Sequence, residues 1–224
     1  MVARCLAITL DCSTLQEKLC LFASRYRGVH VAPQLFKVVE RLLKRLVDPY
    51  VMRTNAFGPQ QFAYTTGRGA RDVLALLTLV WIKALAAGSK VGVYCSDVSG
   101  AFDRVSTERL IKKLHNKKLH ASIVKVFTSW LRQRSSRIVV GGSCSIEMLL
   151  KDMVFQGTVN GPMLWNLFFE DAGHAINERF EEVVFADDLN AYRAFSFGTE
   201  NSNIEKAISN CQRELHKWGR ANQV

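Results

Sequence analysis

The chain has 224 residues and a hydrophobic content of 48%, which is enough to bury a substantial core and excludes an intrinsically disordered protein. Its 30 Lys and Arg against 20 Asp and Glu give a net charge of +10 at pH 7, which favours a phosphate-rich partner. Nucleic acid fits better than a membrane surface, because no basic amphipathic helix with a bulky apolar face stands out; a basic protein without such a partner is the alternative. Six cysteines at irregular spacings, and apolar runs too short for a signal peptide or a membrane span, indicate an intracellular, soluble chain.

The first half of the chain predicts two helices and a strand. From residue 33 onward, apolar residues recur at three- and four-residue spacings and predict an amphipathic helix that ends at the pair Asp48 and Pro49. A second helix is predicted from Asp72, as N-cap, to Gly88, and its apolar character on all sides predicts burial. Alternation over residues 90–96 then predicts a strand.

The next segment predicts two helices and another strand. Ser106 is predicted as the N-cap of a helix that contains Leu110, and an apolar stripe over residues 123–131 predicts a second helix. The sequence RIVVGG (137–142) predicts a strand.

The last third opens with a glycine-rich loop, QGTVNGP (156–162), followed by a helix that the apolar pattern extends to Ile176. A regular stripe over residues 204–218 predicts a final helix up to Gly219, and that helix needs a partner surface. Strands interspersed with helices indicate an α/β or α+β domain.

Two adjacent acids, Asp187 and Asp188, follow the apolar run 183–186, and strand-like residues on both sides predict that they lie in the turn of a hairpin. Such a carboxylate pair repels unless it is protonated or bridged by a cation, and hard oxygen ligands suit Mg²⁺ or Mn²⁺. Taken alone, the pair is better explained as a solvent-exposed Asp-Asp turn. Asp97 changes the balance, because it also ends a strand, and two strand ends side by side bring three carboxylates together.

The loop that contains Gln156, Gly157 and Gly161 lies in sequence between these acids. The Gln156 amide is able to hydrogen-bond a sugar, base or phosphate, and the glycines permit close backbone approach. A structural turn that starts a helix is the alternative explanation of the glycines.

Three segments in order resemble the catalytic motifs of reverse transcriptases: SDVSGAFDRV (96–105), QGTVNGPMLWNLFF (156–169) and FADD (185–188). Two more, YRGVHVAPQLFKVVERLL (26–43) and QFAYTTGRGARDVL (61–74), are similar to the opening and fingers blocks of the non-LTR, LINE-like retrotransposon branch. The resemblance therefore implies an RNA-directed DNA polymerase.

The resemblance covers residues 25–224 and implies a right-hand polymerase, in which the palm is an antiparallel sheet backed by helices. Within it the fingers are expected at about 25–90 and 115–150 and the palm at about 91–114 and 151–224; residues 1–24 stay unassigned. The family continues into a further palm motif and a thumb, and we expect this chain to stop before them.

Carried over residue by residue, the resemblance implies that Asp97 and Asp187 are the principal ligands of two Mg²⁺ or Mn²⁺ ions. Asp188 is implied as the third acid, and the Val98 carbonyl as a further ligand. Asp103, in the same motif as Asp97, is expected to have a structural role.

The resemblance also implies four nucleotide contacts. Phe102 matches the aromatic residue under the incoming sugar, and Gln156 and Gly157 match the loop that lines the nucleotide and the template base. Arg68 is a candidate for a triphosphate contact from the fingers, with a solvated loop arginine as its alternative.

The implied partners are an RNA template, a DNA primer and deoxynucleoside triphosphates, with other domains of a longer polyprotein and an intracellular location, nuclear or cytoplasmic. No membrane contact is expected. Two alternatives stay open: a catalytically inactive nucleic-acid-binding remnant of a retrotransposon, and a two-metal nuclease that uses the same acids.

Overall fold

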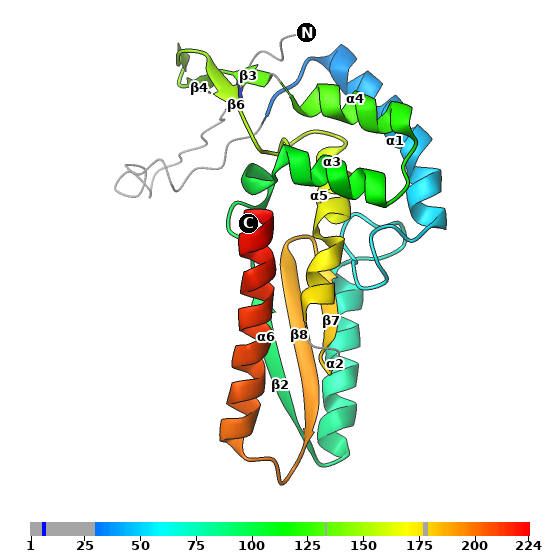
Figure 1. Ribbon diagram of the computed structural model, residues 1–224, viewed down its shortest axis with the longest axis vertical. Coiled ribbons are helices and arrows are strands. Elements are labelled where there is room, and N and C mark those ends of the chain that lie inside the picture. The colour runs from blue at the N-terminus through cyan, green and yellow to red at the C-terminus, as the bar shows by residue number, and fades with distance from the viewer. Residues whose placement is uncertain (1–5, 8–29, 133, 177–178) are drawn as a thin grey trace.

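A computed structural model of the chain describes residues 6–7, 30–132, 134–176 and 179–224 (Figure 1). The α-helices are α1 Gln34–Arg53, α2 Ala70–Ala86, α3 Thr107–Asn116, α4 Ala121–Leu131, α5 Gly161–Phe169 and α6 Asn201–Asn222. Two 3₁₀ helices are η2 Ala101–Arg104 and η3 Glu170–Ala175. The strands are β1 Leu6–Ala7, β2 Ser89–Ser96, β3 Arg134–Ser136, β4 Ile138–Val140, β5 Ser143–Cys144, β6 Met148–Leu150, β7 Glu181–Phe185 and β8 Asp188–Ser196.

The centre of the elongated lower part is a three-stranded antiparallel sheet of order β2-β8-β7 (Figure 1). β2 pairs with β8 along its whole length, from Ser89 opposite Ser196 to Ser96 opposite Leu189. β7 and β8 form a tight hairpin, in which Phe185 pairs with Asp188. The predicted strand over 90–96 and the predicted hairpin are therefore confirmed.

Helices cover both faces of this sheet. A Cβ atom added to Gly92 would lie 2.9 Å from Phe195 and 3.2 Å from Ile204 and Ile208, so β2 lets α6 approach one face closely because residue 92 has no side chain. The neighbouring Val93 faces the other way and packs with Val73 and other residues of α2. Figure 1 shows α6 and α2 flanking the sheet on its two sides, and the partner surface predicted for the last helix is this sheet.

The segment before α2 also joins the sheet. Gln61 forms a parallel bridge with Val184 of β7, in which the Phe62 N–H donates to the Val184 carbonyl at 2.9 Å. The Val184 N–H donates in turn to the Gln60 carbonyl at 2.9 Å. Loop 59–69 is thereby attached to the edge of the hairpin.

The main core extends from α1, α3 and α4 through α5 to buried residues of β8 and α6. Every residue of α5 except Pro162 is buried, and Trp165 and Phe168 are 0% exposed. Phe127 of α4 and Leu110 of α3 are also 0% exposed. The predicted helices in 106–131 are confirmed, and Ser106 is the N-cap residue of α3.

The predicted end of the first helix at the pair Asp48 and Pro49 is wrong. α1 continues through Pro49 to Arg53. A proline inside a helix removes one hydrogen bond and normally kinks or ends it. Here Val47 and Val51, on either side of Pro49, are both buried in the core, so tertiary packing offsets the local cost.

The predicted burial of the second helix is wrong for most of its surface. Val73 and Leu77 are buried, whereas an apolar set on its other faces is exposed: Leu74, Leu76, Leu79, Ile82 and Leu85. One sheet face covers only one stripe of a helix. The helix also starts earlier than predicted, with Gly69 as N-cap, and the Asp72 carboxylate accepts the Gly69 N–H at 2.7 Å.

Two other predicted helix ends are wrong. The helix after the glycine-rich loop ends at Phe169 and continues as the 3₁₀ helix η3, where Gly173 is a poor α-helix former and a Cβ at that position would overlap the Glu182 carboxylate. α6 runs past Gly219 to Asn222, and Gln223 takes the left-handed conformation that ends it.

Candidate active site

The sheet register brings Asp97 and Asp188 to adjacent strand ends. Ser96, the last residue of β2, pairs with Leu189, so Asp97 follows β2 beside Asp188, the first residue of β8. Asp187 directly precedes Asp188 and lies in the hairpin turn that joins β7 to β8. The prediction that two strand ends would lie side by side at these acids is confirmed by this pairing.

An open cleft of about 510 Å³ lies between this end of the sheet and α2. Asp97 and Asp188 both line it, and both side chains are exposed, whereas Asp187 is partly buried. The rest of the lining comes from β2, β7 and β8 and from one stripe of α2: Cys95, Ser96, Phe185, Asn190, Ala70, Val73, Leu74, Leu77 and Trp81. The cleft thus has an apolar wall and an acidic rim.

The donor set fits a hard divalent cation, because carboxylate oxygens are the ligands that Mg²⁺ and Mn²⁺ prefer. Within the described ranges, no three His, Cys, Asp or Glu side chains gather closely enough to hold a metal ion. The acids are therefore of the right chemistry and share one end of the sheet, while a coordinating arrangement of all three is not formed.

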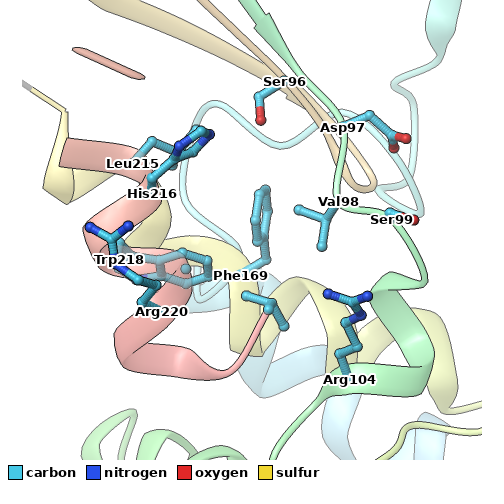
Figure 2. Close-up of a pocket in the computed structure, with 12 residues that line it drawn as sticks. Ser96, Asp97, Val98, Ser99, Arg104, Phe169, Leu215, His216, Trp218 and Arg220 are labelled. Carbon is cyan, nitrogen blue, oxygen red and sulfur yellow. The ribbon is translucent and has the colours of Figure 1, made fainter. Parts of the chain in front are cut away.

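A second pocket, of about 290 Å³, lies beside Asp97 between the end of β2, η2 and the last turns of α6. Figure 2 shows the Asp97 carboxylate directed away from Phe169 and Trp218, which line this pocket, while Val98 points toward its interior. The Val98 carbonyl, the predicted further ligand, accepts the Ala101 N–H at 3.1 Å, and a carbonyl oxygen retains a second lone pair.

Phe102 and the glycine-rich loop lie close together. The Phe102 carbonyl accepts the Val154 N–H at 2.8 Å, and its ring stacks on Trp165 at 5.8 Å between centroids. A Cβ at Gly161 would lie 3.6 Å from the Phe102 ring but only 2.8 Å from the Phe155 carbonyl. Gly161 is thus required by a close backbone approach within the protein, which is the structural alternative named above.

Gln156 and Gly157 begin the same loop. The Gln156 carbonyl accepts the His30 N–H at 3.0 Å, and its side chain is partly exposed. Gly157 is exposed and has φ of 89°, a left-handed conformation that favours glycine. The structure places this loop at the start of α5, next to Phe102, and its contact with a nucleotide stays a prediction.

Arg68 is held by its own loop. One guanidinium nitrogen donates to the Pro59 carbonyl at 2.6 Å and to the Gln61 carbonyl at 3.3 Å, and the guanidinium lies 5.0 Å from the Phe62 ring centroid. The side chain is exposed. Its contact with a triphosphate also stays a prediction.

Two residues that sequence reasoning did not single out hold Ala186, the residue that precedes Asp187 in the hairpin turn. The Gln61 Oε1 atom accepts the Ala186 N–H at 2.9 Å, and its Nε2 donates to the Ala186 carbonyl at 3.3 Å. The Trp165 indole N–H donates to the same carbonyl at 2.9 Å. Both residues lie inside segments with a recognisable pattern, QFAY and PMLWN, but nothing local in the sequence connects them with Ala186.

Tyr64 lies close enough to this turn to sense the charge of Asp187. Burial raises the pKa of the Tyr64 phenol above its ordinary value, and the negative charge of Asp187 raises it further. Loop 59–69 therefore contacts the hairpin through the hydrogen bonds of Gln61 and places Tyr64 within electrostatic range of Asp187.

A buried carboxylate supports the glycine-rich loop from α1. Glu40 is 1% exposed, its carboxylate accepts the Val159 N–H at 3.2 Å, and its carbonyl accepts the Asn160 amide at 3.2 Å. Burial raises the pKa of the Glu40 carboxyl above its ordinary value, and the Val159 N–H and the Arg134 charge only partly offset that effect. Folding therefore shifts the protonation equilibrium of Glu40 toward the neutral acid.

This gives Glu40→Gln a pH-dependent effect. For a group whose pKa is raised by folding, the stabilisation is present below the unfolded pKa and is lost as pH rises through the folded pKa. Glutamine resembles the protonated form, so we expect Glu40→Gln to raise the free energy of unfolding at pH 7 and to change it less at pH 4. Urea titrations at both pH values measure this, with the exposed Glu205→Gln as control; a loss of stability at pH 7 would contradict it.

Comparison with known proteins identifies the family of this chain. Residues 16–221 match the family described as reverse transcriptase (RNA-dependent DNA polymerase). The chain belongs to the reverse transcriptase family.

Relatives of this reverse transcriptase chain come from mobile elements. It is 28% identical over 170 residues to the probable RNA-directed DNA polymerase from transposon BS of Drosophila melanogaster, covering 73% of this chain and 19% of that protein. It is 26% identical over 201 residues to the RNA-directed DNA polymerase from mobile element jockey of the same species, covering 86% and 22%. These relatives belong to non-LTR retrotransposons, which confirms the resemblance read from the motifs. The chain spans about a fifth of their length.

A solved structure extends the comparison to the fold. Apo telomerase from Candida tropicalis superposes with a TM-score of 0.59 at 10% identity, over 87% of this chain and 41% of that chain. At this identity the likeness concerns the fold alone, and it agrees with a reverse transcriptase fold of mixed helices and strands. In the part of the chain that the structure describes, no helix has the length and apolar character that a bilayer span requires.

Proposed function

We propose that this chain is the catalytic part of an RNA-directed DNA polymerase of a non-LTR retrotransposon, which adds deoxynucleotides to a DNA primer on an RNA template. The observation that carries the proposal is the pairing of β2 with β8, which brings Asp97 and Asp188 to neighbouring strand ends beside the turn of Asp187. Membership of the reverse transcriptase family supports a role for these acids in nucleotide transfer.

In this proposal the sheet β2-β8-β7 with its flanking helices is the palm, at about 91–114 and 151–224. The fingers comprise about 25–90 and 115–150. The open cleft beside the acids is the place where the primer end and the incoming triphosphate would meet.

Asp97, Asp187 and Asp188, with the Val98 carbonyl, would hold two Mg²⁺ or Mn²⁺ ions. When bound, such ions supply charge neutralisation at the phosphates and a lower pKa at the primer 3′-hydroxyl. The chain's own contribution is to fix negative charge at two adjacent strand ends, on one side of an open cleft whose other wall is apolar.

Four further residues would orient the nucleotide. Phe102 would lie under the sugar, with its ring fixed by stacking on Trp165. Gln156 and Gly157 would line the nucleotide and the template base, and Arg68 would contact the triphosphate with the guanidinium N–H groups that its own loop leaves available.

The net charge of +10 suits an RNA template held through its phosphates, with the sequence left to base pairing. The proposed setting is intracellular, with the nucleus as the place of integration and the cytoplasm as the alternative. Other domains of a longer polyprotein are proposed as partners, since the relatives extend far beyond the matched part.

A second candidate is a catalytically inactive nucleic-acid-binding remnant of a retrotransposon. The observation that favours it is that no three potential metal-binding side chains are gathered at one point in the described segments. The two candidates differ in turnover and share RNA binding.

Primer extension separates them. The purified chain is mixed with an RNA template, an annealed DNA primer, deoxynucleoside triphosphates and Mg²⁺ or Mn²⁺, and we expect one-nucleotide extension that Asp187→Asn abolishes. Extension by neither protein, from a folded sample that binds the template, would support the remnant. Shortening of the primer or template in place of extension would indicate a nuclease and overturn the proposal.

A further inference from the structure

The residue before Asp187 has a backbone conformation that its own side chain disfavours. Ala186 has φ of 58°, in the left-handed region that non-glycine residues rarely occupy. It is only 8% exposed, so water has little access to its backbone N–H and carbonyl groups. These groups therefore need hydrogen-bond partners within the protein. Some other part of the protein must therefore stabilise this turn.

Gln61 supplies a pair of hydrogen bonds suited to this purpose. Its amide group accepts from the Ala186 N–H and donates to the Ala186 carbonyl, so both polar groups of one residue are bound by one side chain. The Gln61 Oε1 atom also accepts the Ala63 N–H at 3.0 Å. Gln61 is 4% exposed, and at this burial each hydrogen bond is protected from competition with water.

Trp165 of α5 donates its indole N–H to the same Ala186 carbonyl. Its indole is 0% exposed and stacks on Phe169 at 5.0 Å, so the position of its N–H is fixed by the core. The next residue, Asn166, donates to the Ala63 carbonyl at 2.9 Å. Loop 59–69, α5 and the hairpin are thus joined at one residue, Ala186, directly before the acid.

We propose that Gln61 and Trp165 are positioning residues, which hold Ala186 in its left-handed conformation and thereby fix the orientation of Asp187 in the hairpin turn. This inference rests on the proposed function for its kinetic consequence. Its structural content, that these two side chains order the turn, is independent of any activity.

Gln61→Met tests the glutamine, because methionine has a similar length and lacks both hydrogen-bonding groups. We expect faster amide hydrogen exchange in the hairpin, residues 183–190, without a matching increase in the rest of the sheet. In primer extension we expect kcat to fall by about 10- to 100-fold, because a shift of a catalytic group such as the Asp187 carboxylate by about 1 Å has an effect of this size. We expect KM for the triphosphate to change by less than about 3-fold. Trp165→Phe keeps an aromatic side chain but removes the indole N–H together with the five-membered ring. It is expected to act in the same direction, with an added loss of stability because Trp165 is 0% exposed.

Gln60→Met is the matched control, since it makes the same chemical change one residue earlier, outside the side-chain hydrogen bonds to Ala186. Ala186→Gly in the Gln61→Met background should recover part of kcat, because glycine adopts the left-handed conformation without a penalty.

Equal amide exchange rates of the hairpin in Gln61→Met and Gln60→Met would overturn the inference, as would equal kcat in these two variants of an active chain. If the unmodified chain extends no primer, the proposed function fails, and the exchange comparison alone still decides whether Gln61 orders the turn. If Gln61→Met does not fold, Trp165→Phe is judged by the same two measurements against Gln60→Met.

Discussion

Asp97→Asn is expected to lower the rate of nucleotide incorporation by at least about 10³-fold, a loss of about 4 kcal/mol of transition-state stabilisation. Asparagine has nearly the same size and shape but carries no negative charge, so it attracts a divalent cation far less. Asp97 is exposed at the end of β2 and has few contacts to lose, so the free energy of unfolding should hardly change. Steady-state primer extension and urea denaturation on the same preparation measure the two quantities.

Asp103→Asn is the matched control for this prediction. Asp103 lies six residues further along the same motif, is also exposed, and is expected to have a structural role. We expect its incorporation rate to stay within about 5-fold of the unmodified chain, or about 1 kcal/mol. Equal losses for the two variants would remove the case for Asp97 as a metal ligand, since loss of any nearby charge would then account for the effect.

Phe168→Ala is expected to destabilise the fold by about 3 to 5 kcal/mol, which is a large part of the stability of an ordinary domain. The Phe168 side chain is 0% exposed. Its ring centroid lies 6.0 Å from that of Trp165 and 6.2 Å from that of Trp218. The Lys113 ammonium lies 4.3 Å from the ring centroid, and burial lowers the pKa of this lysine, so loss of the ring also removes a cation–π contact from a partly desolvated charge. The free energy of unfolding from urea titration measures the effect.

Phe197→Ala provides the comparison for the same chemical change in solvent. Phe197 follows β8 and is 76% exposed, so its truncation should change the free energy of unfolding by no more than about 0.5 kcal/mol. A loss below about 1 kcal/mol for Phe168→Ala would mean that the core around α5 collapses to fill the cavity.

The local sequence pattern was sufficient to predict the strand ends that carry the acids. Alternation marked β2, the apolar runs around Asp187 and Asp188 marked a hairpin, and the register of β2 with β8 agrees with both. These features depend on residues adjacent in sequence, whose side-chain period reports the local backbone. The roles of the acids, and of Phe102 and the Gln156 loop, came from the motifs and stay predictions.

Features that depend on distant parts of the chain could not be predicted in this way. The Gln61 amide and the Ala186 peptide are 125 positions apart, and no periodicity relates them. The helix through Pro49 depends on core contacts of Val47 and Val51 that outweigh a local stop signal. The exposure of Leu79 and its neighbours on α2 depends on how wide a sheet the helix covers, which its own sequence does not encode.

The bridge between Gln61 and Val184 has a consequence for association between molecules. β7 is an outer strand of its sheet, and an outer strand offers unpaired N–H and carbonyl groups to any other extended chain. Segment 60–62 occupies those groups at Val184 by accepting its N–H and donating to its carbonyl. Loop 59–69, which binds Ala186 in the hairpin turn, therefore also blocks strand addition at Val184, so we expect a chain in which this loop detaches to gain a site for intermolecular β-pairing and aggregation.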